Sequence, residues 1–294
     1  MPTYAGLDAA PLHYDESHPD RGPGLPPVVV LAGGAARHPS YLGDLAGLGS
    51  RYRLIVPHLR GVGRSPEPPV AEVGSFWRQT EDLECLRDHL GLDRVLLVGH
   101  SAGTRLAVAY AARFAQRLAG MVLITPPADY LVDTPSDRVE LIARRRGEPA
   151  FDAAVAASEA GPDLSDDAAF NAWHQRAAPM GYAAWGPAGQ AHAMVGRWSP
   201  AAAKAYFSVE PPGDLAARIG TVEAPVLVIA GADDCLTGLA PVKTLATRFP
   251  AGRAEVIARC GHYPWLEQPG PFRRAIDAFL DEWESTEKGP RPNS

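Results

Sequence analysis

Cysteine is scarce in this chain, and long apolar runs are missing from it. The only cysteines are Cys85, Cys235 and Cys260, an odd number with no C-x-x-C pair. This argues against a framework of disulfides and favours a reducing, cytoplasmic setting. No apolar run approaches the roughly 20 residues that a membrane-spanning helix needs. The N-terminus lacks the basic and apolar segments of a signal peptide.

Charge of one sign is not concentrated anywhere in the sequence. The formal net charge is −6 and no block of like charges stands out, so neither nucleic acid nor a membrane surface is expected as a partner. The histidines show no metal-ligand spacing, and Gly33-Gly34 fits neither a dinucleotide-binding nor a phosphate-loop pattern. We therefore expect no metal and no cofactor.

Short runs of Val, Ile and Leu are what the chain does contain. They do not alternate with polar residues, which is typical of strands covered on both faces. Segments with helical apolar spacing, at 75–90, 102–115 and 271–283, separate several of them. This alternation predicts an α/β fold with a mostly parallel, doubly wound sheet. The expected strands are 27–31, 53–56, 95–98, 121–124, 226–229 and 254–257.

The alternation stops in the middle of the chain. Helical patterns at 136–146 and 148–160 without a clear strand predict a helical cap at 127–213. It would be inserted after the strand 121–124, which is the sixth strand of the fold when the hairpin at the start of the chain is counted. The core would then comprise residues 1–126 and 214–284. The start of the chain, 3–14, is expected to form a peripheral hairpin, and the polar, proline-containing segment 285–294 a disordered tail.

Aromatic residues gather in the second half of this predicted cap. Rings of this kind can pack an insertion onto its core, or they can line an apolar pocket for a small molecule. Both roles stay open at this point. The candidates for substrate contact are Trp173, Tyr182, Trp185 and Trp198.

The pentapeptide Gly99-His100-Ser101-Ala102-Gly103 follows the apolar run 95–98 and precedes a helical segment. It is a G-x-S-x-G pattern in the strand-turn-helix context of a nucleophile elbow, where a tight turn exposes a serine hydroxyl. Glycine lacks a β-carbon, so it permits the sharp turn and the close approach of helix and strand. The pattern predicts Ser101 as a nucleophile.

Two further motifs follow the last two expected strands. The run 226–230 leads into Gly231-Ala232-Asp233-Asp234, and 254–257 leads to Gly261-His262, with Glu267 and Pro269 beyond. With the pentapeptide, these residues make the chain resemble the α/β-hydrolase fold superfamily over roughly residues 3–283. The resemblance implies Ser101 as nucleophile, Asp234 as acid and His262 as base.

The acid has alternatives within the same resemblance. Asp233 could fill that role beside Asp234, and in some members the acid follows the sixth strand, which would select Asp129. We favour Asp234 on the family spacing. His100 is interpreted as a packed residue of the turn rather than as a second base.

A tetrahedral intermediate needs hydrogen-bond donors for its oxyanion. By the resemblance, these are the amides of Ala102 and Gly34. The chain has Ala32 where relatives often carry a histidine; the donor is a backbone group, so this departure need not remove the oxyanion hole. The loop His58-Leu59-Arg60-Gly61-Val62-Gly63-Arg64-Ser65 resembles a D-x-R-G-x-G-x-S loop of these hydrolases, with His58 in place of the aspartate, and we interpret it as a structural turn.

The resemblance implies hydrolysis of a carboxylic ester or small amide of a small-molecule substrate. Gly33-Gly34, the loop 58–65 and the predicted cap also give a weaker resemblance to the proline iminopeptidase group. That group binds a substrate amine through cap glutamates, and Glu140, Glu148, Glu159 and Glu210 are available here. An acyltransferase or cyclase with the same machinery, and a binding protein without turnover, are further alternatives. Nothing in the sequence indicates the oligomeric state.

Overall fold

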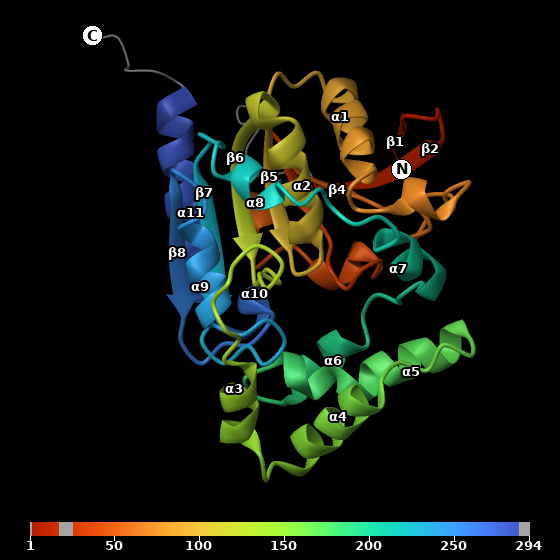
Figure 1. Cartoon of the computed structure of the whole chain (residues 1–294). Helices are drawn as coiled ribbons and strands as arrows, with labels where there is room; N and C mark the ends of the chain where they lie inside the picture. The colour runs from red at the N-terminus through yellow and green to blue at the C-terminus, as the bar shows by residue number, and fades with distance from the viewer. Residues whose placement is uncertain (1, 18–25, 288–294) are drawn as a thin grey trace.

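An eight-stranded sheet forms the centre of the computed structural model, which describes residues 2–17 and 26–287 (Figure 1). The strand order is β1-β2-β4-β3-β5-β6-β7-β8. Neighbours from β4 to β8 run parallel, while β1 and β2 pair antiparallel. The doubly wound α/β architecture is thus confirmed. The strands are β1 (Thr3–Ala5), β2 (Pro11–Glu16), β3 (Val28–Leu31), β4 (Leu54–Pro57), β5 (Val95–His100), β6 (Leu118–Ile124), β7 (Val226–Gly231) and β8 (Gly252–Ile257).

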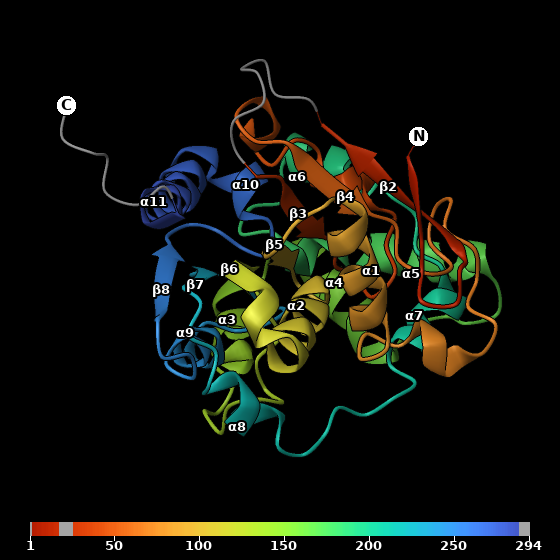
Figure 2. The same cartoon turned by 90° about the horizontal axis from the view of Figure 1, so that it is seen from above.

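Helices cover both faces of the sheet (Figure 2). Successive side chains of a strand point to opposite faces, so in β3 Val29 and Leu31 enter one core and Val28 and Val30 the other. The first core includes residues of α1 (Gln79–His89), α2 (Gly103–Arg113), α8 (Leu215–Ile219) and α9 (Ala240–Ala246). The second includes residues of α10 (Pro264–Glu267) and α11 (Pro269–Glu287). Burial on both faces explains why β3, β5, β6 and β7 lack polar alternation. The expected strand 254–257 differs: it lies in β8 at the edge of the sheet, and most of β8 is exposed.

Between β6 and β7 the chain forms helices only, within the part that the structure describes. The first of them are α3 (Arg138–Arg145), α4 (Pro149–Ala160), α5 (Asp167–Ala177), the 3-10 helix Ala178–Gly181, α6 (Pro187–Ala193) and α7 (Pro200–Tyr206), and we call residues 138–206 the helical insert. Helix α8 follows the insert and belongs to the core. Helices α3 to α6 lie beyond the carboxyl ends of the strands, whereas α7 lies against the core near the 3-10 helix Ala71–Gly74 (Figure 1).

The expected hairpin at 3–14 joins the sheet, because β2 pairs antiparallel with β4. One expectation for the C-terminus needs correction. Helix α11 continues to Glu287, so residues 285–287 are helical rather than part of a disordered tail. After Pro271 in the first turn, no glycine or proline occurs before Gly289-Pro290 that could interrupt the helix. The rest of the expected tail, 288–294, lies outside the described residues. No helix of the described residues is long and apolar enough to cross a membrane.

Candidate active site

Ser101 lies at the tight turn between β5 and α2. Its φ is 50°, a left-handed conformation that side chains rarely adopt, and its amide donates to the carbonyl of Ile124 at 2.9 Å. Gly103 lets α2 approach β3, because a β-carbon there would collide with the carbonyl oxygens of Leu31 and Ala32. This is the geometry that the pentapeptide predicts for a nucleophile elbow.

Asp234 and His262 form a hydrogen bond at the carboxyl ends of β7 and β8. The Nδ1 of His262 lies 2.8 Å from Oδ2 of Asp234, which is fully buried. Asp234 also accepts hydrogen bonds from the amide of Leu236 at 2.8 Å and the hydroxyl of Thr237 at 2.6 Å. Burial alone would raise the pKa of Asp234, but His262 and these donors outweigh it and hold the pKa below its ordinary value. The carboxyl group is therefore an anion that orients the imidazole.

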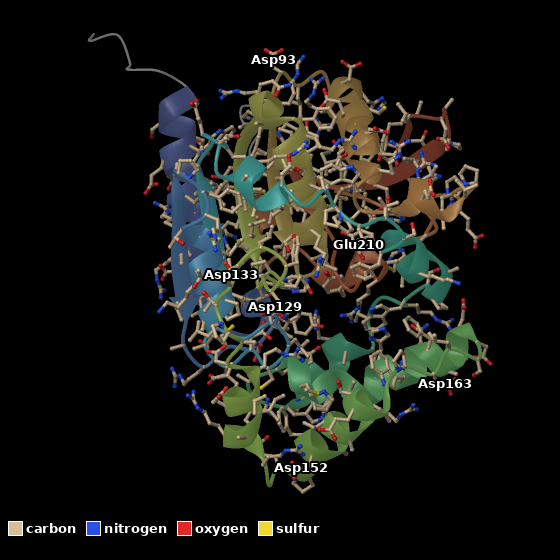
Figure 3. All side chains as sticks on the ribbon, viewed as in Figure 1. Asp93, Asp129, Asp133, Asp152, Asp163 and Glu210 are labelled. Carbon is tan, nitrogen blue, oxygen red and sulfur yellow. The ribbon has the colours of Figure 1, made fainter. Side chains whose placement is uncertain are left out.

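The other candidate acids lie elsewhere. Asp233 faces a cavity beside Glu267 and Gln268, and its amide donates to the carbonyl of Cys260. Asp129 is exposed in the loop after β6 (Figure 3). The geometry thus brings Asp234 to His262, as the family spacing predicts.

A chain of buried hydrogen bonds connects the loops that carry the predicted catalytic groups. The Nε2 of His100 donates to the carbonyl of His262 at 2.9 Å, so its Nδ1 is the acceptor for the hydroxyl of Tyr41 at 2.7 Å. The Tyr41 oxygen in turn accepts from the amide of Gly33 at 2.6 Å. Burial lowers the pKa of His100 well below its usual value, which keeps the ring neutral and this donor order fixed. His100 is therefore a packed residue that connects the loop of His262 to the loop of Gly33 through Tyr41.

The predicted oxyanion hole combines a strained loop and a helix start. Gly34 has a φ of 72°, which glycine adopts readily. Ala35 and Ala36 have φ values of 39° and 81°, and strain of this kind in residues with a side chain clusters at functional sites. A β-carbon on Gly33 would lie 2.8 Å from Cβ of Ser101, so the loop passes directly over the elbow. Ala102 is the N-cap of α2, where the helix dipole favours negative charge.

The four candidate aromatic residues separate into two groups. Trp198 lies against the oxyanion loop, since a β-carbon on Gly34 would be 2.7 Å from its Nε1. Tyr182 packs on Tyr263, the neighbour of His262, with ring centroids 4.8 Å apart. Trp185 contacts Tyr182 rather than a predicted catalytic residue. Trp173 donates to the carbonyl of Ala157 and packs inside the helical insert.

Glu267 ties the helical insert to the loop of His262. Its carboxylate accepts from the amide of Ala183 in the insert at 2.6 Å and from the amide of Gly261 at 2.9 Å. Burial raises its pKa to about 7, although these hydrogen bonds act in the opposite direction. The carboxyl group therefore gains or loses its charge near neutral pH.

Arg37, which the sequence did not single out, also connects insert and core. It is almost fully buried, and its guanidinium donates to the carbonyls of His192, Val195 and Gly196. Within the described ranges no carboxylate forms an ion pair with it. No motif marks this arginine or Tyr41; both are recognised only once the fold brings the insert and the oxyanion loop together.

The side chains of the loop 58–65 contact other parts of the core rather than the predicted catalytic residues. His58 Nε2 lies 3.0 Å from Asp15 in β2, and its Nδ1 accepts from the amide of Arg64. Arg60 forms ion pairs with Asp82 and Asp8. Cys235 and Cys260 are buried thiols whose pKa burial raises, as expected of packed side chains.

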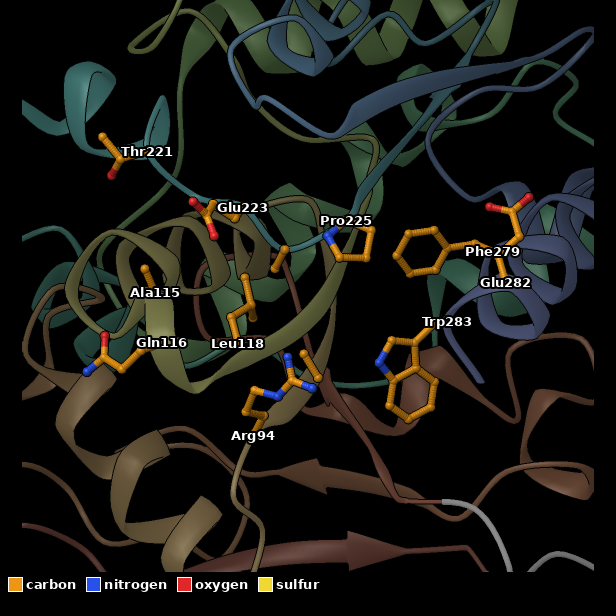
Figure 4. A pocket seen from close by; sticks show the side chains of 12 residues that line it. Arg94, Ala115, Gln116, Leu118, Thr221, Glu223, Pro225, Phe279, Glu282 and Trp283 are labelled. Carbon is orange, nitrogen blue, oxygen red and sulfur yellow. The ribbon is translucent and has the colours of Figure 1, made fainter. Parts of the chain in front are cut away.

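A large cavity lies at the other end of the molecule. Its volume is about 650 Å³, and it is lined by Arg94, Pro225 and Trp283 among others (Figure 4). Arg94 and Pro225 directly precede β5 and β7, so this cavity is at the amino ends of the strands. Open α/β sheets bind their ligands at the carboxyl ends. Among the described residues, no cluster of histidine, cysteine, aspartate and glutamate is placed to hold a metal.

Comparisons with known proteins agree with this geometry. A family model described as alpha/beta hydrolase fold matches residues 26–269. A 2-hydroxy-6-oxononadienedioate/2-hydroxy-6-oxononatrienedioate hydrolase of Pseudomonas putida is 26% identical, over 92% of this chain and 91% of that protein. A thermophilic esterase of Thermogutta terrifontis has a TM-score of 0.68 at 25% identity and covers 97% and 99% of the two chains. A proline iminopeptidase of Mycobacterium smegmatis has a TM-score of 0.72 at 21% identity and covers 96% and 98%. With its sheet order, strained serine turn and matched family model, the chain belongs to the alpha/beta hydrolase fold family.

Proposed function

We propose that the protein is a serine hydrolase that cleaves a carboxylic ester or small amide of a small molecule through an acyl-enzyme on Ser101. The observation that carries this proposal is the hydrogen bond between His262 and the buried anion Asp234. It lies in a loop joined through His100 to the strained turn of Ser101. A serine hydroxyl is a weak nucleophile until such an oriented base takes its proton.

The tautomer of His262 determines the direction of proton transfer. Because Asp234 accepts the proton on Nδ1, Nε2 carries a lone pair and can act as the base. Ser101 Oγ attacks the carbonyl carbon, His262 takes the serine proton, and the carbonyl electron pair moves to the oxygen. The amides of Gly34 and Ala102 stabilise that oxyanion. His262 then protonates the leaving group, and a water molecule that it deprotonates releases the acyl group.

We further propose that residues 127–213 act as a cap over a core of 1–126 and 214–284. Helices α3 to α6 stand beyond the carboxyl ends of the strands (Figure 1). Tyr182 and Trp198 contact the His262 loop and the oxyanion loop. These two rings are the candidates that face the substrate, whereas Trp173 and Trp185 support the cap. A covered site of this kind excludes bulk water from the reaction.

An ester substrate is favoured over an aminoacyl substrate by the charges around the site. Recognition of a substrate amine requires a carboxylate at the site. Glu140 and Glu210 are exposed (Figure 3 labels Glu210), and Glu148 and Glu159 pair with Arg145 and Arg146. The buried charge beside the oxyanion loop is instead the cation Arg37. The iminopeptidase alternative therefore ranks second, supported by the shared fold with the Mycobacterium smegmatis protein.

A fluorophosphonate probe tests the mechanism directly. We expect wild-type protein to be labelled covalently and the Ser101→Ala variant to remain unlabelled. p-Nitrophenyl esters and aminoacyl anilides then separate esterase from aminopeptidase, and product analysis with an added alcohol acceptor reveals acyl transfer. Folded wild-type protein that resists labelling would contradict the acyl-enzyme and favour a binding protein without turnover.

A further inference from the structure

Trp198 reaches the predicted oxyanion hole from a segment that is paired with the oxyanion loop. The amide of His38 donates to the carbonyl of Arg197 at 2.8 Å, and the amide of Ser199 donates to the carbonyl of Ala36 at 3.2 Å. Residues 36–38 and 197–199 thus form a short antiparallel pairing with its bridge between Arg37 and Trp198. The side chain of Trp198 is held at the loop by main-chain hydrogen bonds.

The position of the indole ring is fixed from several sides. The side-chain amide of buried Asn171 donates to the carbonyl of Trp198 and its oxygen accepts from the amide of Trp198. The ring stacks on His174 with centroids 4.1 Å apart, and the Arg37 guanidinium lies 4.2 Å from its centroid. Burial, and then the charge of Arg37, lower the pKa of His174 to about 3, so the imidazole in this stack is neutral near pH 7.

The indole N–H of Trp198 has no acceptor. Its Nε1 is buried and without a hydrogen-bond partner, whereas the equivalent atom of Trp173 donates to Ala157. Proteins rarely leave a buried donor unpaired, because the group loses its hydrogen bonds to water on folding. Other buried side-chain atoms of the described residues also have no partner, among them the Nε1 of Trp283, and water or a functional role can account for such groups. The Nε1 of Trp198 differs in its place against the predicted oxyanion loop, and this position is what favours a ligand acceptor.

The separation of donors suits a single shared oxygen. A β-carbon on Gly34 would lie 2.7 Å from Nε1 of Trp198. A β-carbon is about 2.5 Å from the amide nitrogen of its own residue, so the Gly34 and Trp198 nitrogens are at most about 5 Å apart. An oxygen about 2.9 Å from each nitrogen can accept from both. The Gly34 loop also passes over Ser101, so this oxygen belongs to the group that the serine attacks.

We propose that Trp198 is a further catalytic residue, whose indole N–H donates a hydrogen bond to the substrate oxygen that becomes negatively charged. This inference rests on the proposed acyl-enzyme function. The Ser101 Oγ–carbon bond forms, the carbonyl electron pair moves to the oxygen, and His262 takes the serine proton. Trp198 keeps its own proton and strengthens its hydrogen bond as charge develops. The nearby Arg37 cation favours the same negative charge.

A trifluoromethyl ketone tests the inference, since addition of the serine to it leaves a hemiketal oxyanion in the same place. Trp198→Phe keeps an aromatic ring but removes the donor. We expect it to lower kcat for a p-nitrophenyl ester roughly 100- to 1000-fold and to weaken the ketone's affinity by a similar factor. KM for the ester and the affinity for the matching secondary alcohol should stay nearly constant, because neither the bound ester nor the alcohol carries the oxyanion.

Trp283→Phe is the matched control. It removes another buried, unpartnered indole N–H, at the distant cavity of Figure 4, and we expect activity to be retained. If Trp198→Phe binds the ketone as tightly as wild type, the inference is wrong, whatever happens to kcat. The proposed function is judged separately, by whether the fluorophosphonate labels the wild type. Should Trp198→Phe fail to fold, benzothienylalanine at position 198, which replaces the N–H by sulfur in the same shape, gives the same readout.

Discussion

The backbone strain at Ser101 can be measured by comparing two substitutions, one that keeps the β-carbon and one that removes it. With φ at 50°, a β-carbon costs about 1 kcal/mol relative to glycine. We expect Ser101→Gly to be more stable than Ser101→Ala by about that amount in urea unfolding, although neither variant should react with a fluorophosphonate. Equal stability of the two variants would show that the turn is relaxed.

At the same scale, the residues that the sequence could indicate are those with a motif. Ser101, Asp234 and His262 each follow a strand of the sheet within a recognisable pattern, so their placement at the carboxyl ends of the strands could be predicted. Tyr41 and Arg37 have no such pattern. Their roles arise from hydrogen bonds to Gly33 and to carbonyls of the insert, which depend on how distant segments meet.

Among the elements, the contact between α2 and β3 is the one that places the elbow. Gly103→Ala would push a β-carbon into the carbonyl oxygens of Leu31 and Ala32. Overpacking of this kind costs roughly 1–3 kcal/mol, and the displaced helix start should also lower the labelling rate of Ser101. Gly213→Ala is the control, because no atom lies within 4 Å of a β-carbon there. A Gly103→Ala variant as stable as wild type would contradict this close contact.

The sheet strands were predictable because burial on both faces gives continuous runs of Val, Ile and Leu. Their ends were less so. β6 begins at Leu118, before the apolar run 121–124, because Leu118 and Gly120 pair with β5. The description of α11 reaches Glu287, and from Phe272 to Lys288 the sequence has no glycine or proline that would have marked an earlier end. The course of the helical insert could not be predicted, since its helices are placed by contacts with each other and with the core.

For the whole molecule, Glu267 makes stability depend on pH. Its pKa of about 7 in the folded protein exceeds the 4.5 of a free glutamate, so the folded state binds a proton that the unfolded state releases. Stability should therefore fall as the pH rises from about 4.5 to 7, by up to about 3 kcal/mol. Urea unfolding at pH 5 and pH 8 measures this. In Glu267→Gln, which keeps an acceptor for the amide of Gly261 or Ala183, this part of the pH dependence should vanish; an unchanged difference from pH 5 to pH 8 would refute the assignment.

The antiparallel pairing of residues 36–38 with 197–199 has a consequence for the timing of catalysis. The same two main-chain hydrogen bonds join the insert to the oxyanion loop, so lifting the insert at this edge would free the Gly34 loop and Trp198 together. In the proposed mechanism, a molecule that meets Ser101 while the insert is raised would find the amide of Ala102 in place but not the donors of Gly34 and Trp198. Under the proposed function, enclosing the substrate and completing the oxyanion hole would then be a single event, and an ester that the insert cannot enclose would be left intact.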